Sequence, residues 1–148
     1  MKILRIVVLL ILLQPVVNTH VYSQVEFGAN GSYIFDGNTF GLGLKSLFNL
    51  NENIAGSIGG NYYFNTGNPW DINLDIHYRL IRGKNHFIIY PISGLNIANK
   101  INFDGNSEMG LNLGLFTKIN INRSLVYIEP KYTLGSFGSF ILSAGIIF

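Results

Sequence analysis

A regular alternation of apolar and polar side chains constrains the fold of this chain more than any other feature of its sequence. It is clearest in residues 71–80, where every second side chain is large and apolar and those between are polar or charged. The apolar members are Ile72, Leu74, Ile76, Tyr78 and Leu80, and the polar members are Asn73, Asp75, His77 and Arg79. Successive side chains of a β-strand point to opposite faces, whereas a helix repeats every 3.6 residues. This stretch is therefore predicted to be a strand with one apolar and one polar face.

The same period of two recurs along the chain and predicts eight antiparallel strands. It is clear in residues 25–35 and 110–119 and looser in five other stretches, 39–48, 54–64, 86–97, 125–134 and 140–148. Segments with turn-forming residues separate the strands, at 36–38, 51–53, 65–70, 82–85, 99–109, 120–124 and 135–139. The strand register is left open at residues 45–48 and 88–92, where the alternation slips and Pro91 interrupts the ladder.

The first 23 residues are predicted to be a cleavable signal peptide that precedes a single domain at residues 24–148. Lys2 and Arg5 are followed by an apolar stretch at residues 6–13, and Ser23 ends a region suited to a signal peptidase. Without Lys2 and Arg5, eight of the ten basic residues remain, which equals the number of acidic residues. A neutral domain without a basic tract gives no reason to expect binding to nucleic acid. The absence of cysteine excludes disulfides and thiol chemistry.

The low content of charge indicates which side of the strands faces lipid. Charged residues make up 12% of the chain, against about 25% in a typical soluble domain. Period-two alternation also fits a soluble exported lipocalin-like barrel, whose apolar face would point inward. Such a barrel should carry many Lys, Glu and Asp residues outside, whereas the polar faces here are mostly Gly, Ser and Asn. We therefore expect an all-β, up-and-down transmembrane barrel with its apolar face in the membrane.

The last strand carries the most specific feature. Phe140, Leu142, Ala144, Ile146 and Phe148 alternate as an apolar face that ends on an aromatic residue. In this strand the chain resembles the small outer-membrane β-barrel family of Gram-negative bacteria, the eight-stranded OmpA/OmpX-like barrels. The resemblance implies a location in the bacterial outer membrane and insertion by the barrel-assembly machinery, which would read Phe148 as its C-terminal signal. It implies no catalytic residues.

The inward-facing charges form the predicted functional feature, a lumen charge network. Its members carry both signs: Glu26, Lys45, Asp75, His77, Arg79, Lys118, Glu129 and Lys131. Because unpaired charges are costly in a low-dielectric interior, we expect pairs across the lumen. Asp75 and His77, with Asp71 at the rim, are too few for a metal or acid–base site. No catalytic, metal or cofactor residue is therefore predicted.

The leading functional hypothesis is a monomeric, non-enzymatic barrel with a structural or surface-interaction role and a lumen filled by side chains. A narrow channel for ions or small solutes, using the lumen charges, is the alternative that remains beside the lipocalin-like binder. Among the outward connections, only residues 98–109 have the length of a recognition loop, with Lys100, Asp104 and Glu108 as its charges.

Overall fold

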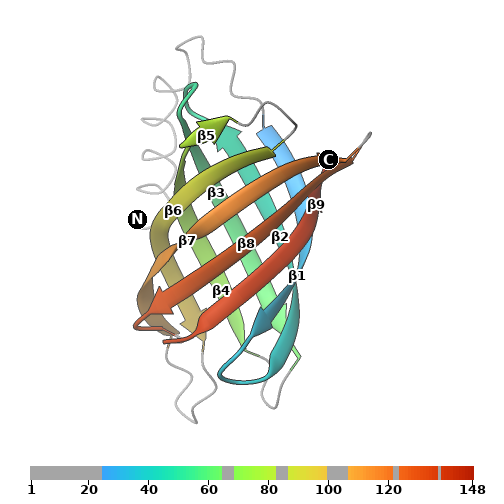
Figure 1. Ribbon diagram of the computed structural model, residues 1–148. Coiled ribbons are helices and arrows are strands. Elements are labelled where there is room, and N and C mark those ends of the chain that lie inside the picture. Colours follow the sequence, from blue (N-terminus) through green and yellow to red (C-terminus); the bar gives the residue numbers. More distant parts are fainter. Residues whose placement is uncertain (1–24, 65–68, 83–86, 100–106, 122–123, 137) are drawn as a thin grey trace, which may run out of the picture.

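The computed structural model describes residues 25–64, 69–82, 87–99, 107–121, 124–136 and 138–148, and within them the chain is built from β-strands (Figure 1). The predicted signal peptide at residues 1–23 lies outside this part. The strands are β1 (Val25–Ile34), β2 (Thr39–Asn49), β3 (Ile54–Tyr63), β4 (Trp70–Tyr78), β5 (Ile81–Arg82), β6 (Phe87–Asn99), β7 (Ser107–Ile121), β8 (Ser124–Leu134) and β9 (Phe140–Ile147). Within the described ranges no helix is long and apolar enough to cross a membrane.

The strands close into an eight-stranded antiparallel barrel in which each strand pairs with its neighbours in the chain. The last strand, β9, pairs with β1, and β4 pairs with β6, so the sheet has no free edge. The short β5 continues the line of β4 along β6, and the two together form one of the eight strands of the wall. The up-and-down barrel predicted from the alternation is therefore confirmed.

The two ends of the barrel differ in what they carry. Val25 and Phe148 lie at the end that is uppermost in Figure 1, called here the terminal end. The opposite end, called here the loop end, carries the turn at residues 36–38 and the described residues 135, 136, 138 and 139 between β8 and β9. At the terminal end, Phe27 and Phe148 exchange two backbone hydrogen bonds of 3.2 and 2.8 Å, which close the junction between β1 and β9.

A β-bulge divides the strand predicted at residues 71–80 and explains the position of Pro91. Between the pairs His77–Ile92 and Ile81–Ile89, three residues of the β4–β5 segment face two residues of β6, and Pro91 is one of those two. Proline has no backbone N–H and is tolerated in a sheet where the ladder is interrupted. The sequence predicts one strand through this point, whereas the structure ends β4 at Tyr78 and begins β5 after Leu80.

The alternation of inside and outside continues through both stretches whose register the sequence leaves open. In β2, Lys45 and Leu47 point inward while Ser46 and Phe48 point outward, and the pairing with β1 runs without a gap. In β6, Tyr90 and Ile92 are buried. The slip seen in the sequence arises because apolar residues such as Leu47 and Ile92 line this part of the lumen, so polarity alone does not report their direction.

The recognition loop expected at residues 98–109 is shorter than predicted. Ala98 pairs with Glu108 and Asn99 with Ser107, so the regular pairing of β6 with β7 includes both ends of the expected loop. Lys100 and Asp104 lie outside the described residues, as do Phe137 and His86. Polar composition does not show where this loop begins and ends, because the strands of a hairpin can pair through their backbones without apolar side chains on both faces.

Candidate functional site

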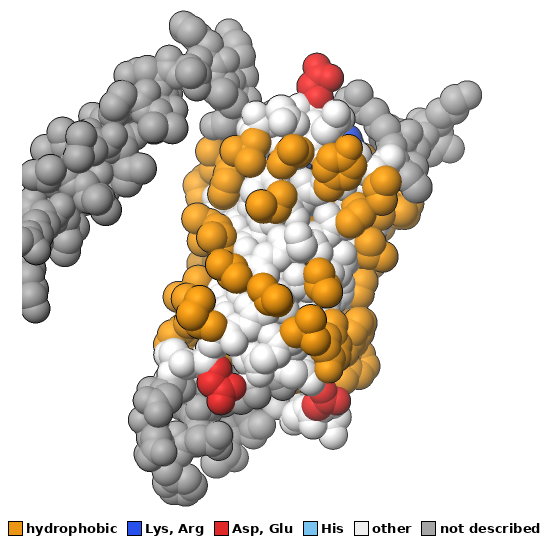
Figure 2. All heavy atoms as spheres, turned by 90° about the vertical axis from the view of Figure 1, so that its left-hand side faces the viewer, with side chains coloured by type: hydrophobic (Ala, Val, Ile, Leu, Met, Phe, Trp, Pro, Cys, Tyr) orange, Lys and Arg blue, Asp and Glu red, His pale blue; other side chains and the backbone are white. Residues whose placement is uncertain are grey.

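The wall and the interior of the barrel have opposite polarity. Outward side chains of β4 are large, apolar and about half exposed: Ile72 at 48%, Leu74 at 50% and Ile76 at 57%. Their neighbours on the same strand, Asp71, Asn73, Asp75 and His77, are buried inside. On the face drawn in Figure 2, apolar side chains are spread over the whole height of the wall with small residues and backbone between them, and acidic side chains lie near its two ends. The interior, or lumen, is therefore where the polar chemistry of this chain is concentrated.

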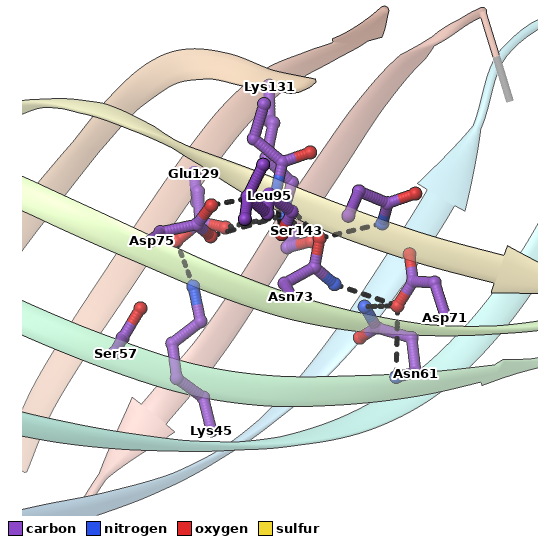
Figure 3. A network of polar contacts seen from close by, with 12 residues as sticks. Lys45, Ser57, Asn61, Asp71, Asn73, Asp75, Leu95, Glu129, Lys131 and Ser143 are labelled. Carbon is purple, nitrogen blue, oxygen red and sulfur yellow. Dashed lines mark hydrogen bonds and ion pairs between the residues drawn. The ribbon is translucent and has the colours of Figure 1, made fainter. Parts of the chain in front are cut away.

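Four charged side chains meet in the middle of the lumen (Figure 3). Lys45 of β2 forms an ion pair with Glu129 of β8. Lys131, two residues further along β8, lies 3.4 Å from Glu129 and 3.6 Å from Asp75 of β4. Lys45 is 7% exposed and the other three are exposed even less. Two positive and two negative groups offset one another, as buried charges require. These residues are called the charge cluster below.

A network of amide and hydroxyl groups extends from the charge cluster toward the loop end. The side-chain oxygen of Asn73 accepts hydrogen bonds from Lys131, Asn96 and Asn112, at 2.9–3.0 Å. The Asn73 amide donates to Asp71, whose carboxylate also accepts from Asn61 and from the Tyr63 hydroxyl at 3.1 Å. Beyond these residues the network reaches further amide and hydroxyl side chains, Asn30, Ser32, Ser143 and Ser136. Polar side chains therefore continue from the charge cluster to the loop end of the lumen, beside a small apolar cluster of Ile34, Tyr63 and Ile141.

Aromatic side chains fill the lumen on the other side of the charge cluster, toward the terminal end. The ring of Phe116 lies 4.9 Å from that of His77, 5.8 Å from Tyr90 and 5.1 Å from Tyr127, measured between centroids. These four residues, called the aromatic layer below, come from β4, β6, β7 and β8. They belong to or contact an apolar cluster completed by Leu47, Ile92 and Ile147. The lumen thus changes from polar to apolar next to the charge cluster.

The remaining predicted lumen residues lie near the terminal end. Lys118 and Glu26 form a partly buried ion pair, with 2.5 Å between Nζ and Oε2. Arg79 donates to the Tyr90 hydroxyl at 3.2 Å and lies over the Tyr90 ring. His77 shares a 2.8 Å hydrogen bond with Ser57 and faces Phe116 edge-on. The structure thus brings Lys45, Asp75, Glu129 and Lys131 together and places the other four predicted residues apart from them.

Glycines on the inner face create the space that the polar side chains occupy. A Cβ at Gly94 would lie 2.3 Å from the Asp75 carboxylate, and one at Gly114 would lie 2.9 Å from the Cα of Lys131. Each of these glycines faces the charge cluster from a neighbouring strand. A narrow eight-stranded barrel has little interior volume. Small residues beside large ones therefore allow the charged side chains to fit.

The lumen leaves very little empty space among these side chains. A cavity of about 10 Å³ lies between the charge cluster and Asn73, Tyr127 and Ser143. That volume is about the minimum needed for one water molecule. Within the described part of the chain, no group of three or more His, Asp or Glu side chains is arranged to hold a metal ion. The described interior is therefore closely packed around the charge cluster.

The predicted site covers only part of this network. The alternation predicts Asp71 at the rim, whereas it is 2% exposed and holds the centre of the amide network. The predicted site also omits the lumen asparagines, although Asn30, Asn73 and Asn112 fall on the polar faces of clearly alternating strands. Their position on those faces is the signal that identifies them. Asn61 and Asn96 belong to strands with looser alternation and carry no such signal.

Comparison with known proteins identifies the same fold in solved transmembrane barrels. The N-terminal β-barrel domain of Pseudomonas aeruginosa OprF matches with a TM-score of 0.63 and 19% identity over 84% of this chain and 96% of that one. A barrel from the de novo design of transmembrane β-barrels matches with a TM-score of 0.58 and 10% identity, over 84% of this chain and 92% of the designed one. The Yersinia pestis outer membrane protein Ail in a phospholipid bilayer nanodisc matches with a TM-score of 0.51 and 17% identity, over 84% of this chain and 100% of Ail. No protein-family model and no curated protein matches the chain.

Proposed function

We propose that this protein is an integral barrel of the bacterial outer membrane with a structural or surface-interaction role and without enzymatic activity. The observation that carries the proposal is the reversed polarity of the barrel. Leu44 of β2 is 70% exposed on the outside, while the next residue, Lys45, is 7% exposed inside. Exposing this apolar outer surface to water would cost free energy, whereas contact with the apolar chains of lipid would not. The fold shared with OprF and with Ail in a lipid nanodisc supports the same location.

Aromatic side chains on the outer face support a membrane position for the two rims. At the loop end, Phe35, Phe40, Tyr62 and Phe64 are each 45–56% exposed, and several of their rings contact one another. At the terminal end, the described exposed aromatic residues include Phe27, Tyr78, Phe87 and Phe148. Membrane barrels place aromatic residues where the wall meets the lipid headgroups. The position of these residues at both ends fits a wall that spans one bilayer.

Two further features belong to this proposal. Residues 1–23 would direct export and be removed, and the domain at residues 24–148 would insert as a monomer with the assistance of the barrel-assembly machinery. Phe148 would be the signal for that machinery. It is 77% exposed, and its backbone is paired with Phe27. The aromatic side chain therefore takes no part in the packing of the closed barrel, which leaves it free to serve recognition.

The structure argues against the two alternatives drawn from the sequence. A soluble lipocalin-like binder needs an apolar cavity inside and a polar surface outside, which is the opposite of the arrangement here. A narrow channel needs a continuous aqueous path, whereas aromatic rings centred on Phe116, which is 1% exposed, fill the lumen next to the charge cluster. A surface-interaction role would depend on the turns at the loop end. The turn at residues 36–38 is held by a 3.1 Å hydrogen bond from Tyr33 to Asn38, which favours a defined shape for recognition.

The proposal can be tested by locating and folding the full-length protein. Expressed in a Gram-negative host, it should fractionate with outer membranes and resist extraction by alkaline carbonate. It should also migrate differently on a denaturing gel before and after boiling, because a closed membrane barrel resists unfolding by the detergent. Recovery in the soluble fraction together with identical migration in the two samples would contradict the proposal.

A further inference from the structure

The lumen is not uniform along its length, and this difference bears on where the barrel excludes ions. From the loop end to the charge cluster, the described interior carries amide, hydroxyl or carboxylate groups at successive levels along the barrel axis. The apolar residues at the loop end, Ile34, Tyr63 and Ile141, come from β1, β3 and β9 and cover one side. On β6 and β8 the same end carries Asn96 and Thr133, both fully buried and polar. Polar groups therefore continue past this cluster.

On the terminal side of the charge cluster, every strand of the wall contributes to the closure of the lumen. The aromatic layer supplies four strands, with Leu47 from β2 and Ile147 from β9 packed in the same apolar cluster. Ser57 of β3 holds His77 by a 2.8 Å hydrogen bond. Gly28 places the backbone of β1 beside the Tyr127 ring, since a Cβ there would lie 3.5 Å from the ring, an ordinary van der Waals distance. The section of the lumen at this level is therefore filled by side chains of β2, β3, β4, β6, β7, β8 and β9, with the backbone of β1 next to them.

Phe116 occupies the centre of this section. Its ring contacts three other rings of the aromatic layer and is 1% exposed. The Nζ atom of Lys45 lies 5.5 Å from the centroids of both Phe116 and Tyr127, so the charge cluster rests directly on the layer. An ion that reached Lys45 from the loop side would next meet aromatic carbon.

We propose that the aromatic layer, centred on Phe116, is the barrier that closes this lumen to ions, and that the buried ion pairs beside it are not. The inference rests on the proposed membrane location and identifies the residue that prevents conduction there. An ion crosses a protein only where water or polar groups replace its hydration shell, and hydrophobic constrictions exclude water. Side chains of the charge cluster and amide network can supply such groups. The rings of Phe116 and Tyr127 cannot.

The experiment measures single-channel currents of the full-length protein folded into planar lipid bilayers. Phe116→Ala and Tyr127→Ala should each produce discrete current steps that the wild type lacks. Each removes a buried ring, and the neighbours of Tyr127 include two glycines that cannot fill the space. Phe116→Leu, which keeps the site apolar but smaller, should produce rarer or briefer steps. It also provides the measurement if the alanine variants do not fold.

Two control variants test whether conduction depends on the rings inside the lumen. One removes a ring from the outer face, and the other removes charges from the lumen. Phe40→Ala removes the same ring from the outer face, where Phe40 is 51% exposed, and should leave the bilayer silent. The double variant Lys45→Gln with Glu129→Gln neutralises the principal ion pair but retains the layer, and it should also be silent. Currents in that double variant, or silence in correctly folded Phe116 and Tyr127 variants, would overturn the proposal.

The closing control distinguishes this inference from the proposed function. Each protein is first shown to insert by its different migration before and after boiling. A wild type that fails to insert would contradict the membrane location itself. A wild type that inserts, with aromatic variants that insert and remain silent, would contradict the role of the aromatic layer and leave the membrane location intact.

Discussion

The outer wall and the lumen of this barrel are made by the same strands, yet they use opposite principles of stability. On β4, Leu74 is half exposed, whereas the adjacent Asp75 is 1% exposed and lies beside Lys131. The wall needs only apolar bulk at every second position, because lipid accommodates any such surface. The lumen needs specific partners, because each buried charge must be offset by another. On the outer wall, a substitution should therefore be tolerated if the new side chain is apolar. In the lumen, it should be tolerated only if the neighbouring buried charges keep a partner.

The largest effect is expected from a single break in the charge cluster. Glu129→Leu would leave Lys45 and Lys131 buried without their shared partner. Removing one member of a buried ion pair costs about 3–5 kcal/mol, and we expect a loss of that size in the free energy of unfolding. Urea titration of the barrel folded in lipid vesicles measures it. The double variant Lys45→Met with Glu129→Leu should recover part of the loss, and equal stability of wild type and Glu129→Leu would contradict the pairing.

A charge on the outer wall is expected to have the next largest effect. Leu74 lies at the middle of β4, so Leu74→Arg places a cation near the centre of the bilayer. The expected cost in unfolding free energy is about 2–4 kcal/mol there and about 0–1 kcal/mol close to an interface. Leu80→Arg, near the terminal end, is the matched control. Equal costs at the two positions, measured in the same vesicles, would contradict the proposed depth of the wall.

The crowding of the lumen predicts a third, intermediate effect. A Cβ at Gly114 would lie 2.4 Å from the backbone oxygen of Pro130, so Gly114→Val forces the strands apart. Overpacking of this kind costs about 1–3 kcal/mol. The control is Gly60→Val on the outer face, where the nearest atom, the backbone oxygen of Asp71, would be 3.3 Å away. The inner variant should lower the urea midpoint more than the outer one, and the reverse order would show that the lumen is not closely packed.

The smallest effect is expected at the ion pair of Glu26 and Lys118. Its side chains are 18% and 14% exposed, so water screens the pair near the terminal end. Glu26→Gln should change the free energy of unfolding by less than about 1 kcal/mol, and the change should shrink as salt is added. Raising the salt concentration in the urea titration tests both points. A loss as large as that of Glu129→Leu would mean that the two pairs are equally buried in the folded barrel.

The fold was predictable from the sequence because its information is local. Residues 71–80 and 110–119 each show their inward and outward faces without reference to any other strand. The partners across the lumen were not predictable in the same way. Lys45 contacts Glu129, 84 residues later, because of the way the barrel closes and its strands are staggered. The sequence of a single strand contains no information about that closure.

The errors of prediction also have physical causes. The terminal half of the lumen is lined by apolar residues such as Phe116 and Tyr127, so polarity does not mark the inner face there. Asp71 resembles a rim residue because it begins an alternating stretch, whereas strand β4 starts one residue earlier and carries Asp71 inside. The break after Tyr78 depends on the facing Pro91 in β6, and only the pairing of the two strands shows it.

The most direct test of the central assignment, lipid outside and polar groups inside, uses the absence of cysteine from the chain. Single cysteines are placed along β9 at its outward positions, Leu142, Ala144 and Ile146, and at its inward positions, Ile141 and Ser143. The outward cysteines are labelled with a small fluorescent maleimide in urea, before the barrel is folded into vesicles, because a thiol that faces lipid chains reacts poorly. In the folded barrel their fluorescence should be quenched by brominated lipid chains. The inward cysteines should stay unreactive until the protein is unfolded. Absence of lipid quenching at the outward positions, or reactivity of the two inward cysteines in the folded barrel, would contradict the account.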